Sequence, residues 1–429
     1  MWNSNLFVKS ALTGILCITS LLAQAPDEKT SKAKIKEIET ATKQGQGSVD
    51  AITAYQRDPD VKVRLEVVNS LIQVGGPRAA DALRVSCEDG SGEIQRLSVA
   101  GILNFYKPGY IKQGWKAKLG ESIQFGSSPE VLIDPYVTAR EQDIAAIRKV
   151  LVNGASREAK LMAGQALAAM RAKSALPDFY PLLKSKDSAF MASALRAIET
   201  SGDKAAAQET VFLLRDLDDK IQARAIAING LYLNEAALPD LAEVFSRGRS
   251  AKSKAAALQA IAMIASPDSK GLFTQNLAVK DPALRGLAAE GLARINATDQ
   301  LDEITKLMDQ ETSARARLGQ AFALVKFGKR ETADFSPLSY LLNTLNSAAW
   351  GDYAVAYLRE LSRDGEIRNI LRSKIPTANR AEKIGIAKIL GYEGNAEDRA
   401  ALDALSHDRD QEVAQEGIKA ARMLSARLP

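Results

Sequence analysis

A short pattern of side chains recurs along this chain about every 31 residues. In most copies a cation or long residue is followed by a small or β-branched residue three positions on, a small residue at six and a bulky aliphatic at seven. The first positions are Arg64, Arg96, Lys160, Met191, Arg224, Lys254, Arg285 and Arg317. Neighbouring copies lie 30 to 33 residues apart, except for one step of 64, which predicts a degenerate unit in between. Self-similarity of this period indicates a repeat architecture.

The spacing within the pattern predicts an α-helix in each repeat. Positions zero, three and seven share one helical face, with position six at its edge. Small residues at three and six allow a neighbouring helix to approach closely, and the aliphatic residue at seven fills the groove between them. Asp60 and Asp281 stand where helices should start, because an Asp side chain accepts hydrogen bonds from the first free backbone N–H groups. A second helix is predicted in most units, and two-helix units must stack to bury their apolar faces. Leu231 and Leu292, at position seven of well-formed copies, are expected to be buried.

The segment from Asp281 to Leu292 resembles the repeat of the HEAT family, in the short form known from phycobilin lyases. It follows the pattern Asp-Pro-x-Val-Arg-x-x-Ala-x-x-Ala-Leu with Leu and Gly substitutions, and residues 60–71 and 219–231 match more loosely. The resemblance implies an all-α fold, a right-handed α–α superhelix of the armadillo/HEAT type over residues 48–429. It also implies that the Arg-bearing helices line a concave binding surface. A protein-binding scaffold is therefore expected, and the alternative is a HEAT-like lyase, an isomerase or a small-molecule-binding protein.

An aromatic, turn-rich stretch at about residues 105–138 interrupts the repeats, as an insertion would. Insertions in solenoids map to loops, often on the binding face. The rings and cations gathered there suggest a partner-contacting patch, because Tyr and Trp dominate binding hot spots. Its predicted members are Tyr110, Lys112, Trp115 and Lys116. The alternative is that these rings fold back into the core.

The N-terminus has the features of an export signal. Lys9 is followed by a short apolar run and by Ala23-Gln24-Ala25, whose small residues suit a signal peptidase. Residues 1–25 are therefore predicted to be cleaved before Pro26, which gives a periplasmic or secreted protein without stable membrane insertion. A membrane anchor is the alternative, but the run is shorter than the roughly 20 residues of a span. Residues 26–47 read as a polar tether or a frayed helix.

Composition narrows the possible chemistry. The 429 residues carry a net charge of +5, with one His and two Cys. A nearly balanced charge gives no basis for nucleic-acid binding, and His-rich metal sites are excluded by the single His407. The sequence holds no Gly-x-Ser-x-Gly, His-Glu-x-x-His or phosphate-loop motif. We therefore expect a protein that is not an enzyme, has no metal or cofactor, and has other proteins as its partners.

Overall fold

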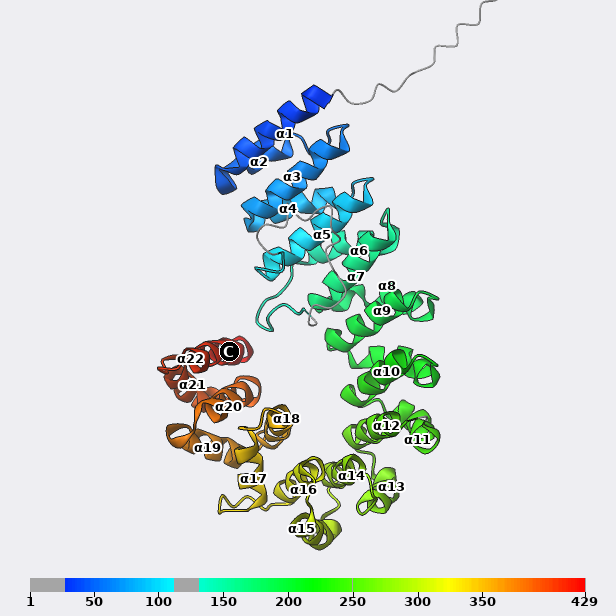
Figure 1. The fold of residues 1–429 in the computed structure, drawn as a ribbon, viewed down its shortest axis with the longest axis vertical. Helices are drawn as coiled ribbons and strands as arrows, with labels where there is room; N and C mark the ends of the chain where they lie inside the picture. The colour runs from blue at the N-terminus through cyan, green and yellow to red at the C-terminus, as the bar shows by residue number, and fades with distance from the viewer. Residues whose placement is uncertain (1–27, 112–130, 249, 429) are drawn as a thin grey trace, which may run out of the picture.

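The computed structural model describes residues 28–111, 131–248 and 250–428, which form helices joined by loops without any β-strand. The helices form two layers along a curved stack (Figure 1). The inner layer holds α1 (Glu28–Thr42), α3 (Val61–Val74), α5 (Gly92–Tyr106), α7 (Arg157–Ala169), α9 (Ser188–Ser201), α10 (Asp219–Leu231), α12 (Ala251–Ile264), α14 (Pro282–Arg294), α16 (Ala314–Lys326), α18 (Gly351–Leu361), α20 (Arg380–Glu393) and α22 (Gln411–Arg427). The predicted all-α solenoid is confirmed.

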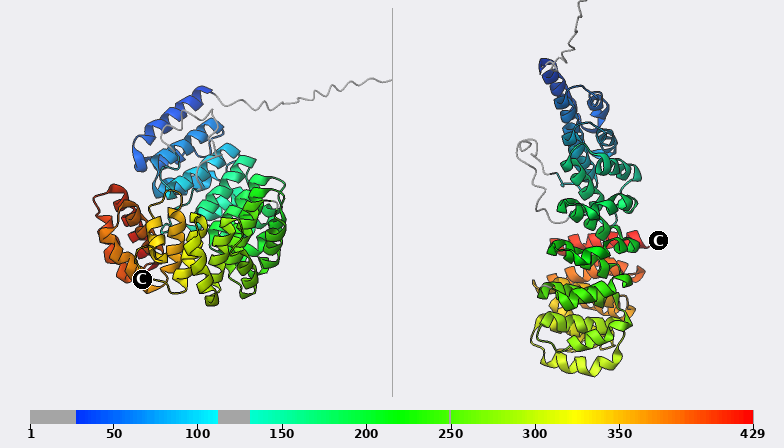
Figure 2. Two further views of the ribbon diagram at one scale, coloured as in Figure 1. Left: turned by 60° about the horizontal axis from the view of Figure 1, so that its bottom comes forward. Right: turned by 90° about the vertical axis from the view of Figure 1, so that its right-hand side faces the viewer.

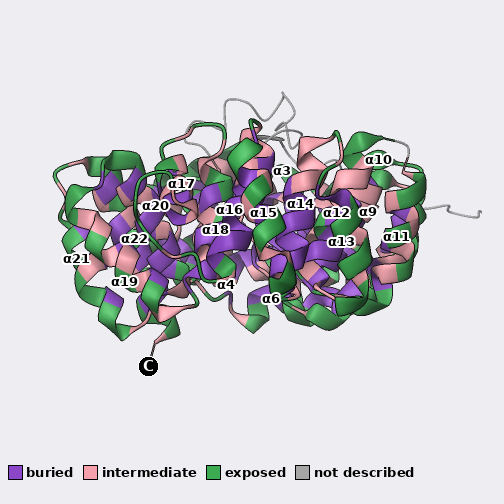
Figure 3. Ribbon diagram, turned by 90° about the horizontal axis from the view of Figure 1, so that it is seen from below, coloured by how far each residue is buried: buried purple, intermediate pink, exposed green. Residues whose placement is uncertain are grey.

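The outer layer alternates with the inner one along the chain. It is built from shorter helices and 3-10 turns: α2 (Val49–Thr53), α4 (Gly76–Ser86), α6 (Glu141–Asn153), α8 (Leu176–Phe179), η4 (Tyr180–Lys184), η5 (Lys204–Arg215), α11 (Leu238–Arg247), α13 (Lys270–Asn276), α15 (Leu301–Gln310), α17 (Pro337–Thr344), α19 (Gly365–Lys374) and α21 (Arg399–Ser406). The stack curves through most of a ring (Figures 1 and 2). Buried apolar side chains continue from repeat to repeat as one core (Figure 3).

The inner helices begin as the sequence predicts. Asp60 accepts a hydrogen bond from the backbone N–H of Lys62 at 2.8 Å, and Asp281 accepts one from Ala283 at 2.8 Å. Each cap satisfies a backbone donor that the helix leaves free, which contributes about 1 kcal/mol. The helix starts are therefore encoded locally, before any repeat stacks on another.

The cation at the first position of the repeat ties neighbouring units together. Arg285 donates through Nη1 to the carbonyl oxygen of Val279 at 2.8 Å and through Nε to Glu311 of the next repeat at 2.7 Å. Arg64 makes the same pair of contacts, with the carbonyl of Asp58 at 2.8 Å and with Asp89 at 2.7 Å. These guanidinium groups are therefore used inside the solenoid.

Each inner helix in the middle of the stack ends in a left-handed residue. These residues have φ between 55° and 107° and follow one another at steps of 31, 31, 32, 31 and 32: Arg171, Gly202, Leu233, Ala265, Asn296 and Gly328. The residue after most of them donates a backbone hydrogen bond five residues back, as Ala297 does to Leu292 at 2.9 Å, and this closes the helix end. The left-handed residue therefore marks the repeat register without reference to side chains.

Two predicted boundaries differ from the structure. Among the described residues, no unit separates the two copies of the 64-residue step, because α5 packs directly on α7. Buried Asp143 of α6 accepts hydrogen bonds from Tyr106 and, at 2.8 Å, from Arg84, which join the two sides of the insertion. Within the stretch predicted to be a polar tether or a frayed helix, residues 28–42 form α1, which buries Ile38 fully and packs on α3. Few residues of α1 are apolar, and this is why the sequence analysis predicted a polar tether and not a packed helix.

The solenoid bends sharply where α14 meets α16. A Cβ atom added to Gly286 would lie 2.8 Å from the carbonyl oxygen of Arg315, and one added to Gly319 would meet the carbonyl group of Gly286. Two glycines thus let the helix backbones touch. The bend brings α18 within reach of α14, although α16 separates them along the stack: Arg294 Nε lies 3.0 Å from Glu360, and the Tyr357 hydroxyl donates to Glu290.

The left-handed positions generate a first prediction. Gly202→Ala should lower the free energy of unfolding by about 1 kcal/mol, because an L side chain is strained at this φ while nothing else lies near the new Cβ. Ala265→Gly should leave the stability unchanged or raise it, because it relieves the same strain in an equivalent turn. Urea unfolding followed by circular dichroism measures both. Equal losses in the two variants would contradict the shared conformation.

The bend generates a second prediction. Gly319→Ala should push α14 and α16 apart, cost about 1–3 kcal/mol of stability and increase the radius of gyration seen by small-angle X-ray scattering. Gly271→Ala is the matched control, since its Cβ on the outer helix α13 would meet nothing within 4 Å. An unchanged radius of gyration for Gly319→Ala would mean that this contact does not set the curvature.

Candidate functional site

The predicted contact patch lies mostly outside the described residues. Lys112, Trp115 and Lys116 fall in the range 112–130, and the structure describes Tyr110 alone. Tyr110 is half-buried, its hydroxyl lies 3.6 Å from the sulfur of Met162, and burial raises its pKa to about 12. Its ring thus packs against α7. The patch as a partner-contacting surface stays a prediction.

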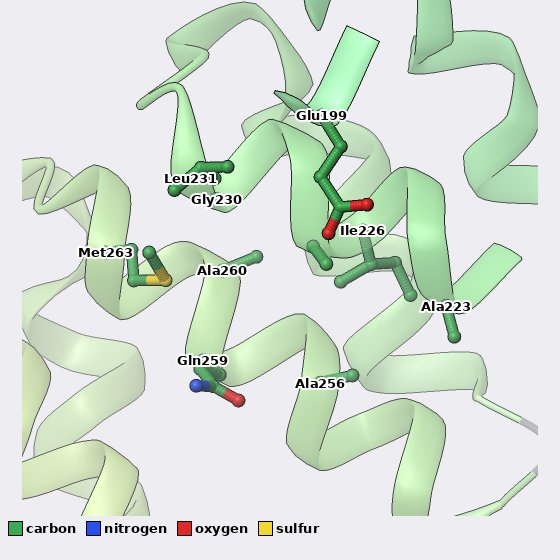
Figure 4. Close-up of a pocket in the computed structure, with 10 residues that line it drawn as sticks. Glu199, Ala223, Ile226, Gly230, Leu231, Ala256, Gln259, Ala260 and Met263 are labelled. Atoms are coloured by element: carbon green, nitrogen blue, oxygen red, sulfur yellow. The ribbon is translucent and has the colours of Figure 1, made fainter. Parts of the chain in front are cut away.

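A groove that sequence reasoning missed lies on the inner face between α10 and α12. Its volume is about 260 Å³. The lining residues come from inner helices alone: Glu199, Ala223, Ile226, Ala227, Gly230, Leu231, Ala256, Gln259, Ala260 and Met263 (Figure 4). Because no outer helix contributes, the groove opens on the concave side of the solenoid.

Small residues create the groove. A Cβ atom on Gly230 would lie 2.8 Å from Cα of Ala260, so α10 and α12 pack backbone to backbone at this point. Ala223, Ala227 and Ala256 leave the space above that contact empty, because their side chains end at Cβ. The longer side chains of Leu231 and Met263 form one end of the groove (Figure 4). The result is an apolar surface with few polar atoms.

Leu231 is the clearest failure of the sequence analysis. It is 46% exposed, whereas Leu292 is fully buried as expected. Leu292 lies four residues before the left-handed residue of its repeat, but Leu231 lies only two before Leu233. The residue four before Leu233 is Asn229, which is fully buried and donates to Thr210 at 2.9 Å. In this repeat the polar Asn229 occupies the position that is aliphatic in the other repeats. The sequence analysis therefore assigned that position to the next aliphatic residue, Leu231, two residues further along the chain.

The one carboxylate in the groove is held by neighbouring cations. Glu199, near the end of α9, lies 3.1 Å from Nη1 of Arg196 and 3.8 Å from Nε of Arg224. It points from α9 toward Ile226 (Figure 4). Tyr232, just after α10, donates to the backbone carbonyls of Ile198 and Glu199 at 2.8 and 2.9 Å, and so fixes α9 against α10. The charge at the rim is therefore balanced, and the groove itself is neutral.

Other candidate chemistry is limited within the described ranges. Over residues 28–111, 131–248 and 250–428, no three His, Cys, Asp or Glu side chains gather closely enough to hold a metal ion. In the same part of the chain, no helix has the length and apolar character needed to cross a membrane. Burial raises the pKa of Cys87 to about 12, so its thiol is protonated at neutral pH and is a poor nucleophile.

The corrected register generates a third prediction. Leu231→Asp should change the melting temperature by no more than a few degrees, because the new carboxylate stays in contact with water. Leu292→Asp should destabilise the protein by several kcal/mol, because the charge would be buried without a partner. Thermal unfolding of the two variants measures the difference. A large loss in Leu231→Asp would restore the original assignment of Leu231 to the core.

No family model matches the chain, and no curated protein matches it. One similar solved structure is an engineered protein from the Northeast Structural Genomics Consortium, with 18% identity and a TM-score of 0.38, covering 94% of this chain and 97% of that chain. Another is the complex of CpcE and CpcF of phycocyanin lyase from Nostoc sp. PCC7120, with 16% identity and a TM-score of 0.33, covering 64% and 96%.

One expectation must be corrected in view of these structures. The sequence analysis expected a protein that is not an enzyme, because no catalytic motif was found. A solved structure similar to this chain is a phycocyanin lyase, which contradicts that expectation. The absence of a linear motif is a weak argument in a solenoid, because residues from separate repeats can meet on one surface without any fixed spacing.

Proposed function

We propose that this protein is a binding solenoid of the HEAT-like type, and that the groove between α10 and α12 holds a segment of another protein. The observation that carries the proposal is an exposed apolar surface on the inner face. Leu231 is 46% exposed and lies beside Met263, Ala227 and Ala256 in one groove. Neither the core nor helix capping requires Leu231 at this position.

The shape of the solenoid supports a protein segment as the ligand. Stacked repeats present a long concave surface, and such surfaces bind extended or helical segments of partners. The groove lies on inner helices in the middle of the stack, where neighbouring repeats on both sides can add contacts. Apolar side chains that enter a small groove are the usual source of binding energy at such interfaces.

A second candidate is the binding of a small apolar molecule. A volume of about 260 Å³ is close to the lower limit of roughly 300 Å³ for ligand sites. Glu199 at the rim could orient a polar end of such a molecule. A lyase or isomerase activity on that ligand belongs to this candidate, and native mass spectrometry of the purified protein would reveal a retained ligand.

The remaining sequence predictions are carried forward as parts of the proposal. Cleavage after Ala25 would place the protein in the periplasm or outside the cell, and its partners would then be exported proteins. Tyr110, Lys112, Trp115 and Lys116 would form a second contact surface. Near-balanced charge, with 57 cationic and 52 acidic residues, gives no support for nucleic acid as the partner.

The proposal generates a fourth prediction. A photo-crosslinking amino acid at Gln259, which is exposed in the groove, should yield a covalent adduct with a partner protein in the native host. The same amino acid at Gln275, exposed on the outer helix α13, is the matched control and should yield none. Leu231→Asp should abolish the Gln259 adduct. Adducts at both positions, or none at Gln259, would refute the concave groove as the protein-binding site.

A further inference from the structure

Helix α18 is seated on the concave side of α14 and α16. The Tyr357 hydroxyl donates to Glu290 of α14, and its ring stacks on Phe322 of α16 with centroids 5.0 Å apart. Three residues later, Glu360 lies 3.0 Å from Arg294 of α14. Tyr357 is buried, and burial raises its pKa well above the ordinary value, so its hydroxyl is a neutral donor. A helix of this chain therefore occupies one part of the inner surface.

The positions that hold α18 recur in every repeat of the middle stack. Glu290 and Phe322 each lie six residues before the left-handed residue of their repeat, Asn296 and Gly328. Arg294 lies two residues before Asn296. Positions in each repeat can therefore be counted back from its left-handed residue. In the seat of α18, the residue six before it (the six-before position) contacts the aromatic side chain of Tyr357, and the residue two before it (the two-before position) contacts the carboxylate of Glu360.

In α10 and α12 the same positions line the groove. The six-before residues are Ala227 and Gln259, and the two-before residues are Leu231 and Met263, counted from Leu233 and Ala265. All four line the groove between these helices. Because α12 packs on α14, the groove continues the surface on which α18 lies. This part of the surface repeats the seat of α18 with different side chains, and no helix of the described residues covers it.

We propose that the groove takes an amphipathic helix of a partner protein, seated as α18 is seated on α14 and α16. This helix presents an aromatic side chain over Ala227 and Gln259 and an aliphatic side chain three residues later against Leu231 and Met263. The inference rests on the proposed function and specifies its ligand. Its basis is the register shared by the two seats.

The side chains of the groove decide which helix fits. Ala227 stands where Glu290 stands in the occupied seat, so it leaves room for a ring, and the Gln259 amide can hydrogen-bond a ring hydroxyl. Leu231 occupies the position that Arg294 occupies in the seat of α18. An acidic side chain of the bound helix, placed as Glu360 is placed in α18, would therefore find no cation in the groove and would be desolvated without a partner. An aliphatic residue would bury its surface against Leu231 and Met263 instead. The expected helix thus differs from α18 chiefly at this one position.

The test uses helix-stabilised, fluorescently labelled peptides of residues 347–363 as probes for the full-length protein, measured by anisotropy. The peptide with Glu360→Leu should bind about tenfold more tightly than the unchanged peptide, and Tyr357→Ala in that peptide should abolish binding. In the protein variant Leu231→Arg the preference should reverse, because the groove then offers the cation that Arg294 offers α18. Phe212→Asp, at a residue 49% exposed on the outer η5, is the control and should change neither affinity.

Each outcome bears on the inference. Reversal of the preference in Leu231→Arg, with no change in Phe212→Asp, supports the shared seat. Failure of both peptides to bind, or an unchanged preference in Leu231→Arg, overturns it. The crosslink at Gln259 reports separately on the proposed function: an adduct there without peptide binding would mean that the groove binds a protein segment that is not a helix of this kind.

Discussion

The close contact between Gly286 and Gly319 lies at the bend on which the binding surface depends. Without side chains, the backbones of α14 and α16 meet directly, so the stack turns sharply toward its concave side. That turn lets α18 reach past α16 to α14, and the pairs Tyr357–Glu290 and Glu360–Arg294 hold it there. A straight stack would separate Tyr357 and Glu360 of α18 from Glu290 and Arg294 of α14. The occupied part of the inner face therefore depends on this close approach, whereas the open groove depends on the separate close approach of Gly230 and Ala260.

The repeat cations have a different task. Arg64 and Arg285 join the loop before their own helix to an acid of the next repeat, so their charge is satisfied within the solenoid. The side chains of Leu231 and Met263 make the inner face at the groove mainly apolar. In this protein the charged positions hold the repeats together, and small and aliphatic positions between them create the surface that we propose for binding.

The fold could be predicted from the sequence because its signals are local and repeated. The Asp caps, the helical spacing and the period each report on one helix and its neighbour. The groove could not be predicted, because Asn229 occupies an aliphatic position and is satisfied by Thr210, a pairing that only the packed structure shows. Because Asn229 stands at this position, the sequence analysis assigned the next aliphatic residue, Leu231, to the core, although Leu231 lies at the surface. The packing of α1 was missed because Ile38 is the one buried apolar side chain among the described residues of this mostly polar helix.

The seat of α18 also changes how this stack can come apart. In a simple repeat array each unit contacts only its neighbours, so units can open one at a time from an end. Here α18 holds α14 across an intervening helix, so opening α16 also breaks the contacts of α14 with α18. The repeats around the bend are therefore coupled into one cooperative block, and the repeats before α10 lie outside it. Local opening of the N-terminal repeats would leave the groove between α10 and α12 anchored to the block that begins beside it.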